Sequence, residues 1–122
     1  MIYSIGYQNL RTLADLIEQL KMHRVELLLD VRSKPYSRNA AFRKDTMERN
    51  LPLNGISYRW MGQTLGGFSE ISESAIKNLA ELQKGKTICL MCMEADPDKC
   101  HRKTEIAMRL DRYHTPVEHI IT

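Results

Sequence analysis

The densest group of reactive side chains lies near the carboxyl end of the sequence, where Cys100, His101 and Arg102 follow one another. An aspartate–proline pair before them, residues 96–97, predicts the start of a helix, because both residue types favour that position. Free backbone N–H groups at a helix start attract anions, and a guanidinium binds phosphate in a bidentate manner. The same field favours a thiolate at Cys100. The trio therefore predicts an anion site with a reactive group, whereas the plainer alternative is a buried Cys100 and a pairing of His101 with Glu105.

Two carboxylates could supply acid–base chemistry. Glu94 follows an apolar run, has no evident structural task, and could act as a general base or a nucleophile. Asp30 ends another apolar run. It could orient Arg32 or Arg38 through an ion pair, or act on a substrate directly.

Positive charge is concentrated in one segment of the chain. Residues 32–49 hold six basic and two acidic side chains, a net charge of +4, whereas the whole chain carries +3. This segment is either a solvated loop and helix face or a patch that binds anions. Within it, Arg32 and Arg38 are the candidates for phosphate contacts, and Tyr36, in a proline-containing loop, is the candidate for stacking on a base.

The three cysteines cannot all pair within one chain, and with no secretory signal we expect reduced thiols. Cys89, Cys92, Cys100 and His101 are ligand types that zinc prefers. However, Cys89 and Cys92 fall in an expected strand, where an odd offset points their side chains to opposite faces. We therefore expect neither a metal site nor a redox pair at these two positions, and no other cofactor.

The elements that must position these residues alternate between strand and helix. Apolar runs predict strands at residues 2–5, 26–31, 56–60, 87–92 and 117–121. Helical spacing of apolar residues predicts helices at 12–23, 44–51, 71–83 and 97–113, and residues 61–69 are expected to be a loop. This order is typical of the α/β class, and we predict a three-layer domain with a mostly parallel five-stranded sheet and helices on both faces. The carboxyl ends of such strands share one edge, which brings Gly6, Asp30 and Glu94 together with the basic loop.

Length and composition limit the classes of protein. A chain of 122 residues fits one domain, residues 1–122, and 43% apolar residues is ordinary for a globular protein. No apolar run approaches the length of a membrane span, so we expect a cytoplasmic protein with no membrane partner. A homodimer is compatible with this size, since dimers are common among small domains.

Several segments together resemble family 488 of the domains of unknown function over nearly the whole chain. They are Ser4-Ile5-Gly6-Tyr7, Asp30-Val31-Arg32-Ser33-Lys34-Pro35, Ser37-Arg38 with Phe42, Gly55-Ile56-Ser57-Tyr58, Leu65-Gly66-Gly67, and Cys92-Met93-Glu94-Ala95-Asp96-Pro97 running into Cys100-His101-Arg102. The resemblance implies a small cytoplasmic α/β protein of bacterial or archaeal type, with little established activity. It also implies shared polar residues at Asp30, Arg32, Arg38, Glu94, Cys100, His101 and Arg102. The loop between Gly67 and Ile71 is shorter than is usual in that family.

Three functions remain open from the sequence. The first is a small enzyme acting on a phosphate-bearing substrate, a nucleotide or nucleic acid, with Arg32, Arg38 and Arg102 on the phosphate and Glu94 and His101 moving protons. The second is a non-catalytic module that binds nucleic acid through the basic segment. The third is cysteine- or metal-dependent chemistry at Cys92 and Cys100.

Overall fold

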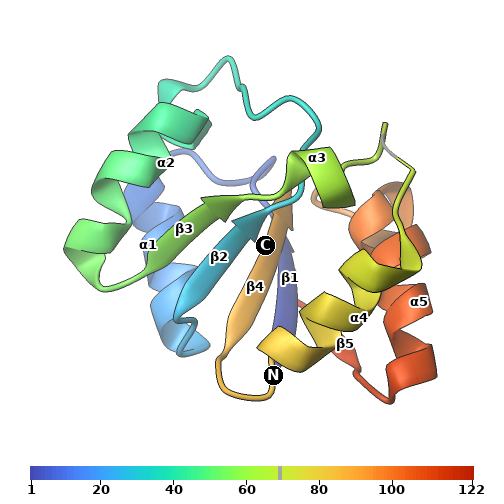
Figure 1. Ribbon diagram of the computed structural model, residues 1–122. Helices are drawn as coiled ribbons and strands as arrows, with labels where there is room; N and C mark the ends of the chain where they lie inside the picture. The colour runs from blue at the N-terminus through green and yellow to red at the C-terminus, as the bar shows by residue number, and fades with distance from the viewer. Residues whose placement is uncertain (69) are drawn as a thin grey trace.

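The computed structural model describes residues 1–68 and 70–122. Its centre is a five-stranded sheet in the order β3-β2-β4-β1-β5, and every pairing of neighbouring strands is parallel. The prediction of a parallel α/β sheet with helices on both faces is confirmed (Figure 1). The strands are β1 (Ile2–Gly6), β2 (Leu27–Asp30), β3 (Ser57–Trp60), β4 (Ile88–Cys92) and β5 (Val117–His119).

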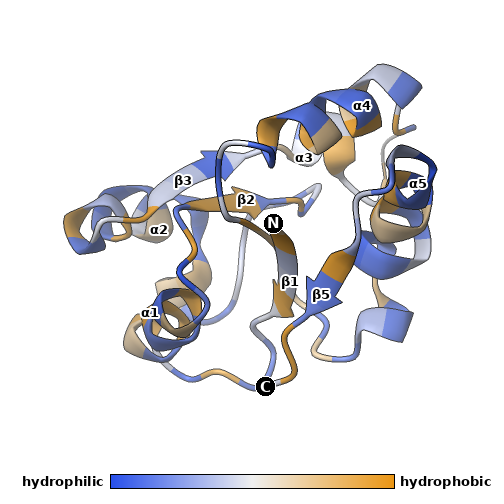
Figure 2. Ribbon diagram, turned by 90° about the horizontal axis from the view of Figure 1, so that it is seen from below, coloured by the Kyte–Doolittle hydropathy of each residue, from blue (hydrophilic) through white to orange (hydrophobic). Residues whose placement is uncertain are grey.

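Four of the five α-helices form two pairs on opposite sides of the sheet, α1 with α2 and α4 with α5 (Figure 2). The α-helices are α1 (Leu13–Met22), α2 (Lys44–Asn50), α3 (Gly62–Leu65), α4 (Glu73–Leu82) and α5 (Met108–Leu110). Short 3-10 turns cover Ala40–Phe42, Pro52–Asn54, Pro97–Lys99 and Asp111–Tyr113. Figure 2 shows the sheet between the α1–α2 pair and the α4–α5 pair.

Two apolar cores follow from this layering. Leu16 and Leu20 of α1 and Met47 of α2 pack with Leu28 against one face. Ile76 of α4 and the helix that contains Leu110 pack against the other face. The central strands β2 and β4 are buried along their whole length, as their uninterrupted apolar sequences predict for parallel strands.

Helix α1 begins where the sequence predicts. The Thr12 hydroxyl accepts a hydrogen bond from Asp15 N at 3.1 Å, and the Asp15 carboxylate accepts one from Thr12 N at 3.1 Å. This reciprocal pair is a capping box. Backbone hydrogen bonds from Arg11 and Thr12 lower the pKa of Asp15.

The last helix differs from its prediction. Instead of one helix over 97–113, the chain forms the 3-10 turn Pro97–Lys99, a π-helical segment Arg102–Ala107, and then α5. Asp96 does cap the first turn, since its side chain accepts from Asp98 N. The helix breaks at Cys100 because this residue has extended backbone, with φ −132° and ψ 140°. The prediction that Cys100 lies inside the first turn of that helix is therefore wrong.

The segment 61–69 also differs, because α3 forms where a loop was predicted. Leu65 of α3 is buried in the same core as Ile106, which gives this short helix an apolar surface to pack on. The short loop expected between Gly67 and Ile71 includes Ser69, which lies outside the described residues.

No helix in the described ranges is long and apolar enough to cross a membrane.

Candidate functional site

The carboxyl edge of the sheet holds a cavity of about 330 Å³. It lies where β1 and β4 are neighbours but lead into helices on opposite faces of the sheet. Open α/β sheets bind ligands at such a switch point, because the diverging connections leave a crevice. The cavity is lined by Tyr7, Arg32, Ser33, Lys34, Tyr36, Gly67, Phe68, Cys92, Met93, Glu94, Lys99, Cys100 and His101.

A second cavity, of about 370 Å³, lies beside β3 and α4. Its lining is mostly apolar or hydroxyl-bearing, and Arg59 is its one charged residue. None of the candidate residues from the sequence lines it. The carboxyl-edge cavity, which we call the edge pocket, is therefore the better candidate for chemistry.

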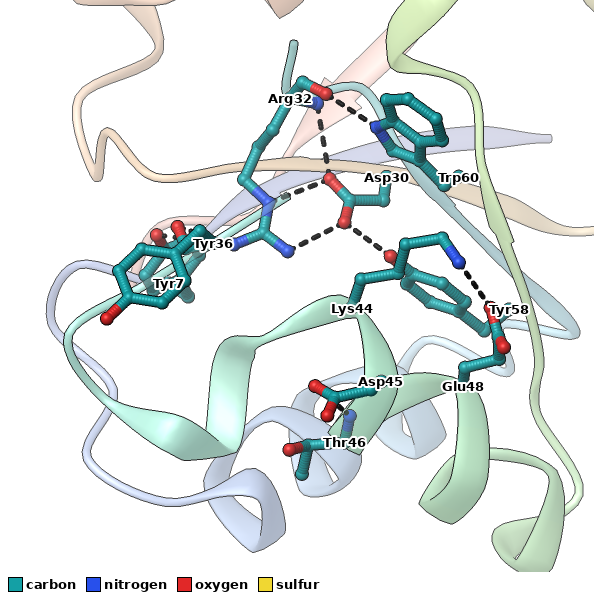
Figure 3. A network of polar contacts seen from close by, with 10 residues as sticks. All are labelled: Tyr7, Asp30, Arg32, Tyr36, Lys44, Asp45, Thr46, Glu48, Tyr58 and Trp60. Atoms are coloured by element: carbon teal, nitrogen blue, oxygen red, sulfur yellow. Dashed lines mark hydrogen bonds and ion pairs between the residues drawn. The ribbon is translucent and has the colours of Figure 1, made fainter. Parts of the chain in front are cut away.

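Asp30 and Arg32 form a buried ion pair at the base of the edge pocket (Figure 3). Arg32 donates from Nε to Asp30 Oδ1 at 2.8 Å and from Nη2 to Oδ2 at 2.7 Å, a bidentate contact. The Tyr58 hydroxyl donates to Oδ2 at 2.5 Å. Asp30 is 0% exposed, so its carboxylate is engaged by these partners and does not reach the cavity.

The electrostatics of this group agree with its geometry. Burial acts to lower the pKa of Arg32, but the hydrogen bonds and charge of Asp30 outweigh burial and raise it. Burial, together with the charge of Asp30, raises the pKa of Tyr58 well above its ordinary value. Arg32 stays charged and Tyr58 stays a donor, which fixes the start of the basic loop that follows β2.

Arg102 is fully buried, at 0% exposure, and its donors point into the protein. Nε donates to Ser4 Oγ at 3.0 Å, and Nη1 donates to the Cys92 sulfur at 3.0 Å and to Glu94 O at 2.7 Å. Ser4 Oγ also hydrogen-bonds His119 Nδ1. Arg102 therefore holds the loop after β4 in place through buried hydrogen bonds. Arg102 does not line the edge pocket.

His119 ends this buried polar chain. Its pKa is lowered by burial first and then by the charges of Arg102 and Lys103. Burial likewise lowers the pKa of Arg102.

Cys92 and Cys100 form a disulfide in the wall of the edge pocket. The prediction of reduced thiols is therefore wrong for these two residues. The break of the helix at Cys100 places its sulfur against Cys92, a contact that the predicted continuous helix did not include. Cys89 is free and buried on the opposite face of β4, in the other core.

His101 is held in one orientation. Its Nε2 lies 2.9 Å from both Val31 O and Leu65 O, so this nitrogen carries a proton and donates to the two carbonyls. Nδ1 is then the nitrogen free to accept a proton, and it lies 3.7 Å from the Cys100 sulfur. A Cβ added to Gly67 would lie 3.2 Å from Nδ1, so this glycine leaves room for the ring.

Glu94 lines the edge pocket from the loop after β4. Its backbone carbonyl accepts from Arg102, while its carboxylate has no hydrogen bond or ion pair within residues 1–68 and 70–122. A Cβ on Gly6 would lie 1.8 Å from Glu94 O. Gly6 thus allows the loop that carries Glu94 to approach β1, and it does not line the pocket.

The remaining predicted residues lie at the pocket and beside it. Tyr36 lines the edge pocket with 63% of its surface exposed, and Arg43 stacks over its ring at 4.9 Å. Arg38 lines a neighbouring cavity of about 250 Å³, which shares Tyr7 and Met93 with the edge pocket. Arg38 and Tyr36 therefore line two separate but neighbouring cavities.

Lys34, Lys99 and Phe68 are among the pocket residues that the predicted site did not include. Lys34 and Lys99 are exposed at the edge pocket, and Phe68 is 88% exposed there. Neither lysine ammonium forms an ion pair with another residue in the described parts of the chain. Lys34 could have been found from the basic segment, whereas Lys99 and Phe68 carry no local signal of their own.

Among the described residues, no group of three or more histidine, cysteine, aspartate or glutamate side chains is placed to hold a metal ion. The four zinc-type ligands considered from the sequence therefore form no such group. They are Cys89, Cys92, Cys100 and His101.

Comparison with known proteins identifies a family for this chain, but no individual protein that matches it. Neither the curated proteins nor the solved structures that were searched contain a match to this chain. One family model, DUF488, described as a domain of unknown function, matches residues 12–75 and 68–105. These ranges include β2, β3 and β4 and all the pocket residues named above except Tyr7. The resemblance seen in the sequence is confirmed, and the chain belongs to the DUF488 family.

Proposed function

We propose that this protein is a small enzyme that binds a phosphate-bearing substrate, a nucleotide or a segment of nucleic acid, in the edge pocket. The observation that carries the proposal is that Lys34, Lys99 and Glu94 line one cavity and that their side chains have no hydrogen bond or ion pair within residues 1–68 and 70–122. Cations without an internal partner attract anions, and a carboxylate among them is suited to proton transfer. Arg32 also lines this cavity, with its charge paired to Asp30.

The aromatic side chains favour a ligand with a base. Tyr36 and Phe68 both line the edge pocket and both expose most of their surface. Aromatic rings beside cations hold bases by stacking while the cations hold phosphates, and each stacked base contributes about 1–3 kcal/mol. An inorganic phosphate ion would bind the lysines but would not stack on these rings.

Glu94 and His101 are the two groups that could move a proton at a ligand in this pocket. Glu94 accepts or donates through its free carboxylate, and His101 accepts through Nδ1 because Nε2 is committed to two carbonyls. Asp30 is occupied by Arg32 and Tyr58, so we assign it a positioning role for the basic loop.

Replacing Glu94 with glutamine tests the catalytic part of this proposal. A panel of nucleotides, nucleosides and short oligonucleotides would first be screened by thermal shift, because a ligand of the folded state raises the melting temperature. Turnover of the ligand that binds would then be followed by chromatography. Glu94→Gln should lower turnover by about 10²–10⁴-fold, the usual contribution of a general acid or base. Its affinity for the ligand should stay within a few-fold of wild type.

Glu105→Gln is a matched control, since Glu105 lies on the π-helical segment away from the pocket. If Glu94→Gln turned over the ligand at the wild-type rate, Glu94 would not be a catalytic residue. No turnover of any bound ligand by the wild type would favour the second candidate.

The second candidate is a module that binds nucleic acid without catalysis. It is favoured by the neighbouring cavity lined by Arg38, which shares Tyr7 and Met93 with the edge pocket. Affinity for a single-stranded oligonucleotide should then fall steeply with salt. It should not respond to Glu94→Gln.

A further inference from the structure

The two bonded cysteines differ in their surroundings. Arg102 Nη1 lies 3.0 Å from the Cys92 sulfur, and the guanidinium is fully buried there. A positive charge in hydrogen-bond distance stabilises a thiolate, so charge on sulfur is favoured at Cys92. His101 Nδ1 lies 3.7 Å from the Cys100 sulfur and can accept the proton of a thiol at that position.

Cys92 and Cys100 are both lining residues of the edge pocket, where they are 4% and 6% exposed, so the disulfide lies in the wall next to any molecule that enters. Cys89 is different, because it is fully buried in the core on the opposite face of β4 and burial raises the pKa of its thiol. The chain thus contains a cysteine pair at the edge pocket and a single cysteine enclosed in a core.

We propose that Cys92 and Cys100 form a thiol–disulfide exchange centre for an anionic small-molecule thiol, with Cys100 as the exchanging sulfur and Cys92 as the resolving sulfur. In the reducing direction, an external thiolate attacks the Cys100 sulfur. A new sulfur–sulfur bond forms between the two, the Cys92–Cys100 bond breaks, and its electron pair stays on Cys92 beside Arg102. A second external thiolate then attacks the sulfur of the first, releases the external disulfide, and leaves Cys100 as a thiolate that takes a proton.

In the oxidising direction the same bonds form and break in reverse. Cys100, after losing its proton to His101 Nδ1, attacks an external disulfide and expels one thiolate. The Cys92 thiolate then attacks the Cys100 sulfur, forms the internal disulfide and expels the second thiolate. Two protein thiols are oxidised and one external disulfide is reduced to two thiols.

The assignment of the two roles follows from leaving-group chemistry. Thiol–disulfide exchange is faster when the departing sulfur has the lower thiol pKa. Arg102 touches Cys92, so attack on Cys100 releases the better-stabilised thiolate. Attack on Cys92 would release Cys100, which has no guanidinium beside it among the described residues.

The charges at the pocket indicate which thiols are favoured. Lys34 and Lys99 have no ion-pair partners among the described residues, and Lys99 directly precedes Cys100. Carboxylate-bearing disulfides should therefore react faster than cationic ones of the same length. This proposal does not rest on the phosphate ligand proposed above, and each can fail without the other.

The test uses the whole protein, reduced with dithiothreitol and then freed of it. Oxidised glutathione is added, samples are quenched with iodoacetamide, and the mass of intact protein and peptides is measured. Wild type should lose two alkylatable thiols with no lasting glutathione adduct, and Cys89→Ser should behave in the same way. Cys92→Ser should accumulate a glutathione adduct at Cys100. In the reducing direction, oxidised wild type treated with reduced glutathione and quenched with acid should carry its glutathione adduct at Cys100 and not at Cys92, because Cys92 is the sulfur that departs.

Charge preference is measured with a matched pair of probes. Dithiodipropionate is anionic and cystamine is cationic, and the first should oxidise wild type several-fold faster at low salt. The difference should shrink in the double variant Lys34→Ala/Lys99→Ala.

A glutathione adduct at Cys92 instead of Cys100 during reduction of the wild type would overturn the assignment of roles. Retention of all thiols by wild type in oxidised glutathione would overturn the exchange centre itself. Should Cys92→Ser not fold, Cys92→Ala replaces it, and the thiol count of wild type decides the main point without any variant.

Discussion

Asp30→Ala is expected to destabilise the protein by about 3–5 kcal/mol, the usual cost of removing one partner from a buried ion pair. Arg32 would remain buried with its charge uncompensated, because both of its short contacts to a carboxylate are lost. The Tyr58 hydroxyl would lose its acceptor as well. Unfolding in urea, followed by circular dichroism, measures the loss.

Replacing both Asp30 and Arg32 separates the effect of an uncompensated charge on stability from the effect of lost packing. Asp30→Ala/Arg32→Met removes both charges, and apolar replacement of a whole buried pair is often neutral or stabilising. The double variant should therefore recover much of the stability that Asp30→Ala loses. Tyr58→Phe should lose only about 1 kcal/mol, the net contribution of one hydrogen bond. An unchanged free energy of unfolding in Asp30→Ala would contradict the positioning role assigned to Asp30.

Arg102→Met is the second replacement with a large expected effect. It removes the donors that satisfy Ser4 Oγ, Glu94 O and the Cys92 sulfur in a fully buried site. Each buried polar group left without a partner costs about 1–3 kcal/mol, so the total loss should exceed about 3 kcal/mol. The loop after β4 should also lose order, which hydrogen exchange at residues 93–99 would report.

Arg102→Lys separates geometry from charge. A single ammonium cannot reach the spread acceptors that the guanidinium fork serves, so this variant should also lose stability. Arg49→Met is the matched control, because Arg49 is exposed on α2, and its stability should change little. If Arg102→Met kept its stability but lost ligand affinity, Arg102 would be a ligand contact and its assignment as a support for the loop after β4 would be wrong.

The sequence predicted the layers well because the strongest signals are local. Leu27, Leu28 and Leu29 mark a strand that is buried on both faces, and the spacing of Leu16 and Leu20 marks the inner side of α1. Strand order depends on which connections place consecutive strands next to each other in the sheet and which place them further apart. No local sequence pattern encodes this difference. The sequence therefore predicted a parallel sheet without its order β3-β2-β4-β1-β5.

The candidate site, like the fold, could be predicted only in part from the sequence. The ends of β2 and β4 directed attention to Asp30 and Glu94, and an ion pair of Asp30 with Arg32 was one of the expected alternatives. Tyr58 was missed as the third member because its role depends on the pairing of β2 with β3. Chemistry at Cys92 and Cys100 was one of the open functions, but their disulfide was not predicted because reduced thiols were expected without a secretory signal.

Arg102 shows the limit of reasoning from residue type. An arginine beside an expected helix start suggests a phosphate contact, but this side chain turns inward and holds the loop instead. Its total burial is a property of the packed structure, since the sequence around it contains charged neighbours on both sides.

Calorimetric titration of the double variant Lys34→Ala/Lys99→Ala is the most direct test of the proposal that the edge pocket binds a phosphate-bearing ligand through these two lysines. The ligands are nucleoside mono- and diphosphates and a short single-stranded oligonucleotide. The control is Lys21→Ala/Lys77→Ala, which makes the same change in charge on exposed faces of α1 and α4. Each charge-assisted contact contributes about 1.5–3 kcal/mol, so the double variant should lose at least about 100-fold in affinity. Its salt dependence should also weaken by about one unit of slope per lost contact, while the control keeps both values. Equal losses in the two double variants, or no loss in either, would contradict a phosphate site in the edge pocket.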